Sequence, residues 1–174
     1  MEIRIRRECA ADYPEVYELV KTSFATLPDA DGTEADYLND VRKKDAFIPE
    51  LSLVAEHESG KLVGQIVLYK TDIAAHGKTV TELVLSPICV HPDYFGRGIA
   101  RVLMENAFAR ARDLGYSAVF LCGDPRFYRK FGFAPSCEHG IYHVSDTAKN
   151  AEWCMARELV CGALEGIGGV VDIV

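Results

Sequence analysis

The chain has 174 residues, which is close to the size of one ordinary domain. Apolar residues make up 49% and charged residues 26%, a composition that excludes a disordered, collagen-like or disulfide-dependent miniprotein. The net charge of -7 and the sequence pI near 5.2 argue against a protein that covers nucleic-acid phosphates, so we expect no nucleic-acid partner.

Two features of the sequence concern the compartment. No run approaches the roughly 18 consecutive apolar residues of a membrane span. Residues 1–8 alternate apolar and charged side chains instead of forming the apolar core of a secretory signal. We therefore expect a cytoplasmic protein with no membrane partner, folded as a single domain over residues 1–174. The sequence leaves the oligomeric state open, with a homodimer as one option.

The six cysteines predict reduced thiols rather than a disulfide framework. They are Cys9, Cys89, Cys122, Cys137, Cys154 and Cys161. No pair has the Cys-x-x-Cys spacing and no histidine cluster completes a zinc pattern, so we expect no metal. Most of the cysteines stand in apolar runs, where a cysteine is usually a small core residue. A nucleophilic cysteine is the minor alternative.

The N-terminal part of the chain predicts a strand and two helices. Residues 3–6 alternate as a half-buried strand does. Residues 12–15, Asp-Tyr-Pro-Glu, are typical of a capping box with proline in the first turn, and apolar residues from Val16 to Phe24 follow at helical spacing. A weaker cap at residues 33–36 precedes a second helix, whose apolar face runs from Tyr37 to Val41.

The middle of the chain predicts three strands. Two β-branched-rich runs, residues 51–56 and 62–69, are separated by Glu58-Ser59-Gly60-Lys61, which indicates a hairpin. A further apolar run from Glu82 to Val90 predicts the third strand. It contains Pro87, which cannot donate to a ladder and therefore belongs at a bulge or an edge.

The C-terminal half predicts a long helix followed by shorter elements. The helix begins after Gly98 and ends at Gly115. Its predicted apolar face comprises Ile99, Val102, Leu103, Ala107, Ala111 and Leu114. A strand is expected at residues 117–122, a short helix at 125–131 and a late strand at 153–160. This order of elements predicts a mixed α/β sheet with helices packed on it.

The glycine-rich turn at residues 95–100 predicts an anion site. It lies between an apolar strand and a long helix, where backbone N–H groups point outward and the helix dipole adds positive potential. A Walker A sequence is absent, and Arg101 stands where the dinucleotide fingerprint requires a third glycine. The turn therefore indicates a phosphate site of another kind, and a nucleotide-binding protein is the weakest interpretation.

The residues around this turn resemble the acetyl-CoA motif of the GNAT superfamily of N-acetyltransferases. That motif, Gln/Arg-x-x-Gly-x-Gly/Ala after a strand ending in Val-x-Pro, stands here as Phe95-Gly96-Arg97-Gly98-Ile99-Ala100 after Val90-His91-Pro92. Residues 123–133 are similar to the Gly-Asp-Pro-x-x-Tyr-x-x-Phe-Gly-Phe segment of the YhbS-like branch, as are residues 162–166. Because the hairpin and helices match in order, the resemblance spans nearly the whole chain.

The resemblance implies a fold, a cosubstrate and a set of binding residues. The fold is a mixed, mostly antiparallel α/β sheet flanked by helices and splayed at a bulge near Pro87, and the cosubstrate is acetyl-CoA. Backbone groups of Ile88, Cys89 and Val90 would contact the pantetheine arm. The loop that would hold the pyrophosphate comprises Phe95, Gly96, Arg97, Gly98, Ile99, Ala100 and Arg101. Phe95 replaces the usual Gln or Arg, and the Asn common on the fifth strand is absent; backbone amides should still bind the pyrophosphate.

The resemblance also implies catalytic residues. Tyr128 matches the family's general acid, a phenol with an ordinary pKa near 10 that protonates the leaving thiolate. A core tyrosine is the alternative. Glu82, at the start of the central strand, is the candidate base, with a solvated strand-end glutamate as the alternative. His91 competes as the base because of its ordinary pKa, and Cys89 as an acetyl acceptor is the remote option.

The sequence thus predicts an acyltransferase, an acetyl-CoA-dependent N-acetyltransferase that acts on a primary amine by direct attack in a ternary complex. The acceptor, a small molecule or a peptide, stays open. Acidic residues crowd the region where this family's acceptor usually enters, and they either attract a cationic amine or favour a helix N-terminus. They are Asp29, Asp31, Glu34 and Asp36. The alternative function is a CoA-binding sensor or interaction module without turnover.

Overall fold

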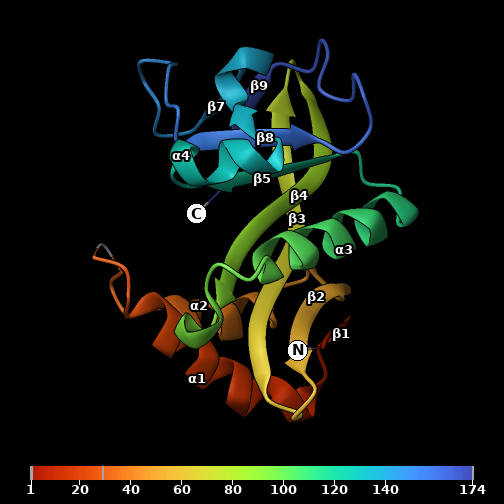
Figure 1. Cartoon of the computed structure of the whole chain (residues 1–174). Coiled ribbons are helices and arrows are strands. Elements are labelled where there is room, and N and C mark those ends of the chain that lie inside the picture. Colours follow the sequence, from red (N-terminus) through yellow and green to blue (C-terminus); the bar gives the residue numbers. More distant parts are fainter. Residues whose placement is uncertain (1, 29, 174) are drawn as a thin grey trace. The chain divides into compact units, whose positions relative to one another are not determined.

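Two strands and one helix of the chain are shared between two compact units. The computed structural model describes residues 2–28 and 30–173. The first unit comprises Met1–Tyr69 and Ser86–Arg110, and the second comprises Lys70–Leu85 and Ala111–Val174. Strand β3 (Leu62–Ala75), strand β4 (Lys78–Val90) and helix α3 (Ile99–Asp113) each begin in one unit and end in the other (Figure 1).

The first unit contains the strand, the two helices and the hairpin that the sequence predicts. Besides its parts of β3, β4 and α3, its elements are β1 (Ile3–Arg7), the 3-10 turn η1 (Ala10–Asp12), α1 (Tyr13–Phe24), α2 (Glu34–Val41), β2 (Phe47–His57) and the 3-10 turn η2 (Pro92–Tyr94). β2 pairs antiparallel with both β1 and β3. The hairpin closes at Gly60, where φ is +86°, a conformation that glycine adopts without strain. α1 and α2 lie side by side (Figure 1).

Helical spacing of apolar residues determines how α1 and α2 pack. Each helix buries a stripe of side chains three and four residues apart and leaves its polar face exposed. The buried side chains of the two helices are Val16, Leu19 and Val20 on α1, and Ala35, Leu38 and Val41 on α2. The neighbouring strands are buried on both faces over residues 51–55 and 62–69, which explains why they are continuous apolar runs in the sequence.

The capping box predicted at the start of α1 is wrong, although Pro14 does stand in the first turn. Asp12 already has helical backbone angles, φ -80° and ψ -22°, because η1 continues directly into α1. An N-cap side chain needs an extended backbone to reach the first turn. The Asp12 carboxylate instead accepts the Cys9 N–H at 2.8 Å and pairs with the Arg6 guanidinium at 2.7 Å. Hydrogen bonding to Arg6 holds the pKa of Asp12 well below its usual range.

The apolar face predicted for α3 is partly wrong. Val102 and Leu114 are 41% and 47% exposed, whereas Met104 and Phe108 are buried. The buried stripe of α3 includes Met104 and Phe108 and leaves Val102 outside it. Leu114 follows Asp113, the last residue of the helix. The predicted end is confirmed, because the Gly115 N–H bonds to the Arg112 carbonyl at 2.9 Å and φ at Gly115 is +92°.

The second unit consists of short strands around β5. Besides its parts of β3, β4 and α3, its elements are β5 (Ala118–Cys122), α4 (Pro125–Tyr128), the 3-10 turn η3 (Arg129–Phe131), β6 (Ala134–Pro135), the 3-10 turn η4 (Ser136–His139), β7 (Ile141–His143), β8 (Cys154–Glu158) and β9 (Gly169–Val171). β5 pairs in parallel with β4 and antiparallel with β8. β6 pairs with β8, while β9 pairs with β3 and β7. Strands of two or three residues show no alternation, so β6, β7 and β9 escaped prediction.

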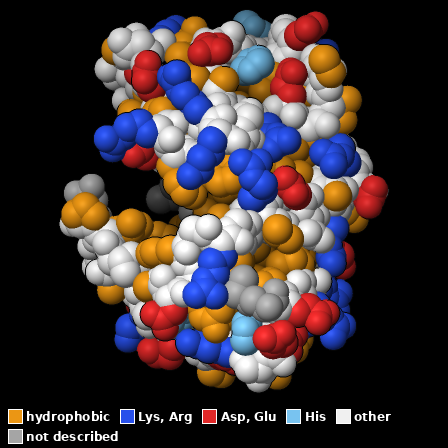
Figure 2. Space-filling model, in the orientation of Figure 1, with side chains coloured by type: hydrophobic (Ala, Val, Ile, Leu, Met, Phe, Trp, Pro, Cys, Tyr) orange, Lys and Arg blue, Asp and Glu red, His pale blue; other side chains and the backbone are white. Residues whose placement is uncertain are grey.

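The predicted fold class is confirmed, since the chain is a mixed α/β protein with mostly antiparallel strand pairing. β4 continues through Pro87 and pairs with β5 ahead of it, at Leu83 and Val84. No helix within residues 2–28 and 30–173 is long and apolar enough to cross a membrane. Figure 2 shows charged side chains of both signs on the face that it draws, with hydrophobic side chains between them.

Gln65 is a polar residue in an apolar environment, and this leads to a prediction about stability. Its side chain, on β3, is fully buried, and within the described part of the chain both amide atoms lack a hydrogen-bond partner. A buried unsatisfied polar group lowers stability by about 1–3 kcal/mol. We therefore expect Gln65→Met, which preserves volume, to raise the free energy of unfolding by about that amount. Urea unfolding measures this change, and a lower midpoint in the variant would contradict it.

Candidate active site

The turn between β4 and α3 has the geometry of an anion-binding loop. φ is +72° at Gly96 and +79° at Gly98, and nothing lies within 4 Å of a Cβ built at either glycine. The space beside the backbone is therefore open. α3 begins at Ile99, directly after the second glycine, and the first N–H groups of a helix have no partner inside the helix. The loop can present several backbone donors to one anion.

His91 fixes the start of this turn. Its N–H donates to the Val63 carbonyl at 2.8 Å, which anchors the end of β4 to β3. Its Nδ1 accepts the Asp93 N–H at 3.3 Å and caps η2, while Nε2 lies 3.2 Å from the Lys61 Nζ. Both ring nitrogens of His91 thus have neighbours in the protein, and this favours a structural role over that of a base.

Basic side chains accompany the turn. The Arg97 guanidinium lies 5.2 Å from the centre of the Tyr94 ring, and the Lys61 ammonium lies 5.9 Å from the same ring. Arg101, in the first turn of α3, lies 3.9 Å from Glu105. Phe95 is 54% exposed. The sequence did not indicate that Lys61 adds positive charge near this turn, because Lys61 belongs to the hairpin between β2 and β3, far from the turn in sequence.

Cys89 lies in the strand segment expected to contact a pantetheine arm. Its side chain is buried, whereas those of Ile88 and Val90 are half-buried, as alternation along a strand requires. Burial raises the pKa of the Cys89 thiol to about 12, against smaller opposing effects of hydrogen bonds from Ser23 and the Gln65 backbone. The thiol is therefore protonated at neutral pH, so the geometry does not favour Cys89 as an acetyl acceptor.

Tyr128 ends a short helix in the second unit. The Asp124 side chain caps α4 by accepting the Arg126 N–H at 2.9 Å, and Gly132, with φ +81°, ends the segment. The Tyr128 ring packs edge-on against Phe133, with ring centres 5.8 Å apart. A Cβ built at Gly123 would lie 2.4 Å from the Tyr128 ring, so only glycine permits this packing. Burial raises the pKa of Tyr128 to about 12.

Glu82 is a buried anchor. It is 6% exposed, so the alternative of a solvated strand-end glutamate is wrong. Its Oε2 accepts the N–H groups of Ser117 and Ala118, both at 3.0 Å, and its Oε1 accepts the Ser117 hydroxyl. These three bonds join β4 to the start of β5. They favour a structural role, and the role of a base stays a prediction.

The acidic residues near α2 form local hydrogen bonds. Asp31 accepts the Thr33 N–H at 2.9 Å, and hydrogen bonding to Thr33 lowers the pKa of Asp31. Asp36 accepts the Tyr17 hydroxyl at 3.0 Å. Glu34 begins α2, while Asp29 lies outside the described residues. Asp31 and Asp36 therefore have hydrogen-bond partners inside the protein, and their positions need no bound amine as an explanation.

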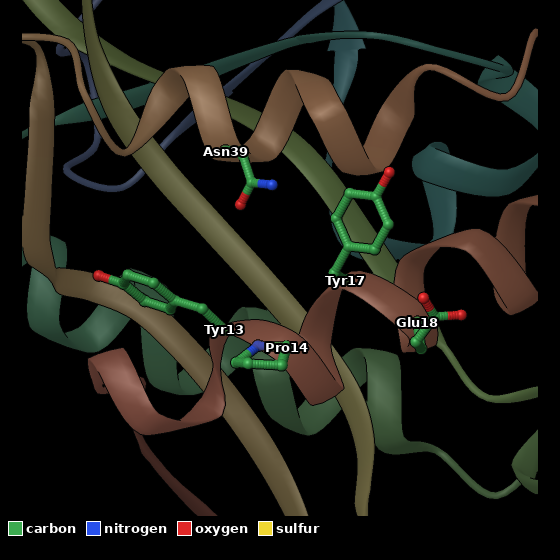
Figure 3. Close-up of a pocket in the computed structure, with 5 residues that line it drawn as sticks. All are labelled: Tyr13, Pro14, Tyr17, Glu18 and Asn39. Atoms are coloured by element: carbon green, nitrogen blue, oxygen red, sulfur yellow. The ribbon is translucent and has the colours of Figure 1, made fainter.

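A shallow groove on the first unit was not found from the sequence. It measures about 360 Å³ and is lined by Tyr13, Pro14, Tyr17, Glu18 and Asn39 (Figure 3). Four of these residues come from α1, and Asn39 points toward them from α2. The sequence feature that could have indicated the groove is the pair Tyr13 and Tyr17, which lie one helical turn apart on α1. The groove shares no residue with the predicted site, and the described residues contain no cluster able to hold a metal ion.

The family follows from comparison with known proteins. Residues 4–136 match the acetyltransferase (GNAT) domain. This chain is a GNAT acetyltransferase. The uncharacterized N-acetyltransferase YhbS of Escherichia coli K12 is 30% identical over 168 residues, which cover 97% of this chain and 94% of YhbS. The uncharacterized N-acetyltransferase Rv2669 of Mycobacterium tuberculosis is 31% identical over 136 residues, 72% of this chain and 74% of Rv2669.

Solved structures agree with this assignment. The crystal structure of Escherichia coli YhbS in complex with CoA has a TM-score of 0.86 and 27% identity, over 100% of this GNAT chain and 91% of YhbS. A GNAT acetyltransferase from Brucella melitensis in complex with acetyl-CoA has a TM-score of 0.77 and 25% identity, over 99% and 96% of the two chains. The predicted family, GNAT with a likeness to YhbS, is confirmed.

The three bonds of Glu82 generate a prediction. Glu82→Gln replaces one accepting oxygen by an NH₂ group that faces a donor, so we expect the free energy of unfolding to fall by about 1–3 kcal/mol. Ser117→Ala removes only the hydroxyl partner and should have a smaller effect. Urea unfolding of both variants measures the two losses. Wild-type stability in Glu82→Gln would show that the carboxylate does not anchor β5.

Proposed function

We propose that the chain transfers the acetyl group of acetyl-CoA to a primary amine by direct attack in a ternary complex, working as one acetyltransferase domain over residues 1–174. The observation that carries the proposal is the turn before α3, in a chain of the GNAT family. Gly96 and Gly98 both have left-handed backbone angles there, and the space beside them is open. The complexes of YhbS with CoA and of the Brucella melitensis enzyme with acetyl-CoA support this choice of cosubstrate.

The turn fits a pyrophosphate. The backbone N–H groups from Gly96 to Arg101 would bind its oxygens, and the guanidinium groups of Arg97 and Arg101 would add positive charge. Because the space beside both glycines is open, the backbone can approach the phosphates closely. Phe95 offers no hydrogen bond, so backbone donors supply most of the affinity.

The segment from Ile88 to Val90 would hold the pantetheine arm through backbone groups, as the family resemblance implies. An N–H group there that faces the thioester carbonyl would stabilise the developing oxyanion, an effect worth about 3 kcal/mol. Acetyl-CoA supplies the activated acyl group and a thiolate leaving group. The buried, protonated Cys89 supports direct attack by the amine over an acetylated enzyme.

Tyr128 is the proposed general acid. With a pKa of about 12, its phenol carries a proton across the whole neutral range. As the amine nitrogen bonds to the carbonyl carbon and the C–S bond breaks, the phenol donates its proton to the sulfur. The nitrogen loses one proton to solvent, and the phenolate regains a proton from solvent. An ordinary thiol has a pKa of about 8.5, below that of this phenol, so the phenol assists only when its proton transfer is concerted with cleavage of the C–S bond.

The amine must be neutral when it attacks. Glu82 and His91 are the candidate bases, but both already make hydrogen bonds inside the protein. These bonds support a mechanism in which the amine loses its proton to solvent before it binds. Glu82 as the base predicts that the activity lost in Glu82→Gln shrinks as pH rises and more of the amine is neutral.

The acceptor class and the compartment are parts of the proposal. A primary amine on a small molecule or a peptide is the acceptor. All six cysteines are free thiols, which supports a reducing compartment such as the cytoplasm. A CoA-binding sensor is the second candidate, favoured by the hydrogen bonds that occupy both candidate bases; it would bind CoA but release no thiol in the presence of any amine.

Binding of CoA tests the loop. We expect CoA to stabilise the fold by about 2.7 kcal/mol at a hundredfold excess over Kd, which thermal unfolding measures as a rise in Tm. Gly98→Asp should abolish this rise, because it puts a carboxylate and a strained φ into the phosphate site. Gly77→Asp, at a left-handed turn between β3 and β4, is the matched control. A folded Gly98→Asp protein with a full shift would disprove the loop assignment.

Activity tests Tyr128. We expect Tyr128→Phe to lower kcat by about 10²–10⁴-fold and to leave acetyl-CoA affinity nearly unchanged, since the ring packing is retained. Because the pKa of Tyr128 is about 12, the wild-type rate should show no loss from its ionisation below about pH 10. Thiol release with a reactive amine measures both effects. An unchanged kcat, with chemistry limiting the rate, would remove Tyr128 from the mechanism.

A further inference from the structure

Cys122 and Cys154 are direct partners across two antiparallel strands. Cys122 ends β5, Cys154 begins β8, and the strand register places them opposite each other. The neighbouring Gly123 N–H donates to the Trp153 carbonyl at 2.8 Å, so Gly123 and Trp153 form a hydrogen-bonded pair. The cysteines therefore occupy the adjacent non-hydrogen-bonded position, where Cα atoms are about 4.5 Å apart and side chains lie closest. Disulfides join Cα atoms about 4.4–6.8 Å apart, so the backbone already permits a bond.

The two cysteine side chains interact, and polar groups surround them. The Cys122 thiol donates to the Ile173 carbonyl at 3.9 Å, and it also interacts with the Cys154 side chain across the strand pair. The buried Ser136 hydroxyl also donates to the Cys154 sulfur, at 3.2 Å. His143 favours a negative charge on Cys154 and Asp146 opposes it. The interaction with Cys122 and the hydrogen bond from Ser136 lower the pKa of Cys154. The interaction with Cys154 and burial raise the pKa of Cys122. Of the two sulfur atoms, Cys154 is therefore the one whose surroundings favour the thiolate.

We propose that Cys122 and Cys154 are a reversible redox pair that closes to a disulfide on reaction with hydrogen peroxide. The Cys154 thiolate attacks one peroxide oxygen; an S–O bond forms, the O–O bond breaks, and the departing hydroxide becomes water after taking a proton from solvent. The Cys122 sulfur then attacks the Cys154 sulfur. The S–S bond forms, the S–O bond breaks, and the leaving hydroxide takes the Cys122 proton as a second water. Two thiols lose two electrons, and one peroxide is reduced.

The low exposure of the two sulfur atoms favours a small oxidant. Cys154 is 1% exposed and Cys122 is half-buried, so a molecule of the size of hydrogen peroxide reaches them more readily than a bulky disulfide. The other cysteines lack this arrangement. Cys9 and Cys161 are exposed, and burial raises the pKa of both Cys89 and Cys137. The pair is therefore the preferred intramolecular disulfide.

Oxidation of the pair should change the packing of Tyr128 and lower kcat, an inference that rests on the proposed function. Gly123, which packs against the Tyr128 ring, is covalently attached to Cys122. A bond from Cys122 to β8 brings the two sulfur atoms to bonding distance and restricts the end of β5, next to the surface on which the ring rests. Because catalysis is sensitive to small displacements of its reacting groups, we expect the oxidised protein to have a kcat lower by about tenfold or more.

Peptide mapping tests the pair without reference to activity. Trypsin cuts after Arg112, Arg126, Lys149 and Arg157, so Cys122, Cys137 and Cys154 lie in different peptides. The reduced full-length protein is treated with a small excess of hydrogen peroxide at pH 7 and quenched with N-ethylmaleimide. We expect the peptides of residues 113–126 and 150–157 to be joined, with the mass of two hydrogens lost, and dithiothreitol to separate them. Their absence, or an equal yield of another intramolecular pair, would overturn the proposal.

Variants separate the steps. Cys122→Ser should leave a sulfenic acid on Cys154 that dimedone traps once the protein is unfolded, and Ser136→Ala should slow disulfide formation several-fold. Cys137→Ser, which removes a thiol next to Ser136 in the sequence, should behave as wild type. A wild-type rate in Ser136→Ala would remove its hydroxyl from the mechanism.

Activity before and after oxidation separates the two proposals. Peroxide should inactivate wild type and spare Cys122→Ser, and dithiothreitol should restore the wild-type rate. If the disulfide forms with no change in kcat, the link to Tyr128 is wrong. If the reduced enzyme acetylates no amine, the proposed function fails, and peptide mapping still decides whether the dithiol exists.

Discussion

The left-handed backbone at Gly96 and Gly98 is the constraint on which the proposed chemistry depends. Only glycine adopts this conformation without strain, and two such residues let β4 turn into α3 within a short loop. A third glycine seats the helix: a Cβ at Gly64 would lie 3.0 Å from Leu103 and 3.1 Å from Ile99, so its absence lets α3 pack closely on β3. Packing on β3 thus fixes the N-terminus of α3, and the loop leaves the space beside its backbone N–H groups open to an anion. A phosphate site needs both properties.

The second unit is organised around β5 in a comparable way. Glu82 binds the first residues of this strand through two backbone N–H groups and a hydroxyl. β8 pairs with the whole length of β5, from Ala118 opposite Glu158 to Cys122 opposite Cys154. Gly123 then carries the chain into α4 and forms the surface against which Tyr128 packs. The position of the proposed acid therefore depends on a strand that is fixed at both ends.

Cysteine chemistry in this protein follows the local environment. At Cys89 burial dominates over two weak donors, and the pKa rises to about 12, so the thiol behaves as a core residue. At Cys154 the interaction with Cys122 and the hydrogen bond from Ser136 outweigh burial, and the pKa falls. Both residues are buried. The balance between burial and the hydrogen bonds to the sulfur distinguishes an inert thiol from a reactive one.

Local sequence patterns determined much of this protein. Helical spacing located α1 and α2, the turn residues located the hairpin, and the glycines located the turn between β4 and α3 and both C-terminal helix ends. These features depend on backbone preferences within a few residues, which a single sequence records. Motif order over the chain was enough to identify the family, which the match over residues 4–136 confirms.

The tertiary structure decided which partner each polar side chain takes. Asp12 had the spacing of a helix cap but binds Arg6, because η1 gives it helical backbone angles. Glu82 had the position of a solvated glutamate but is buried against Ser117, 35 residues away. Cys122 and Cys154 meet only because β5 and β8 pair in one register. A hydrogen bond depends on distance and direction in space, and the fold brings together donors and acceptors that the sequence keeps far apart.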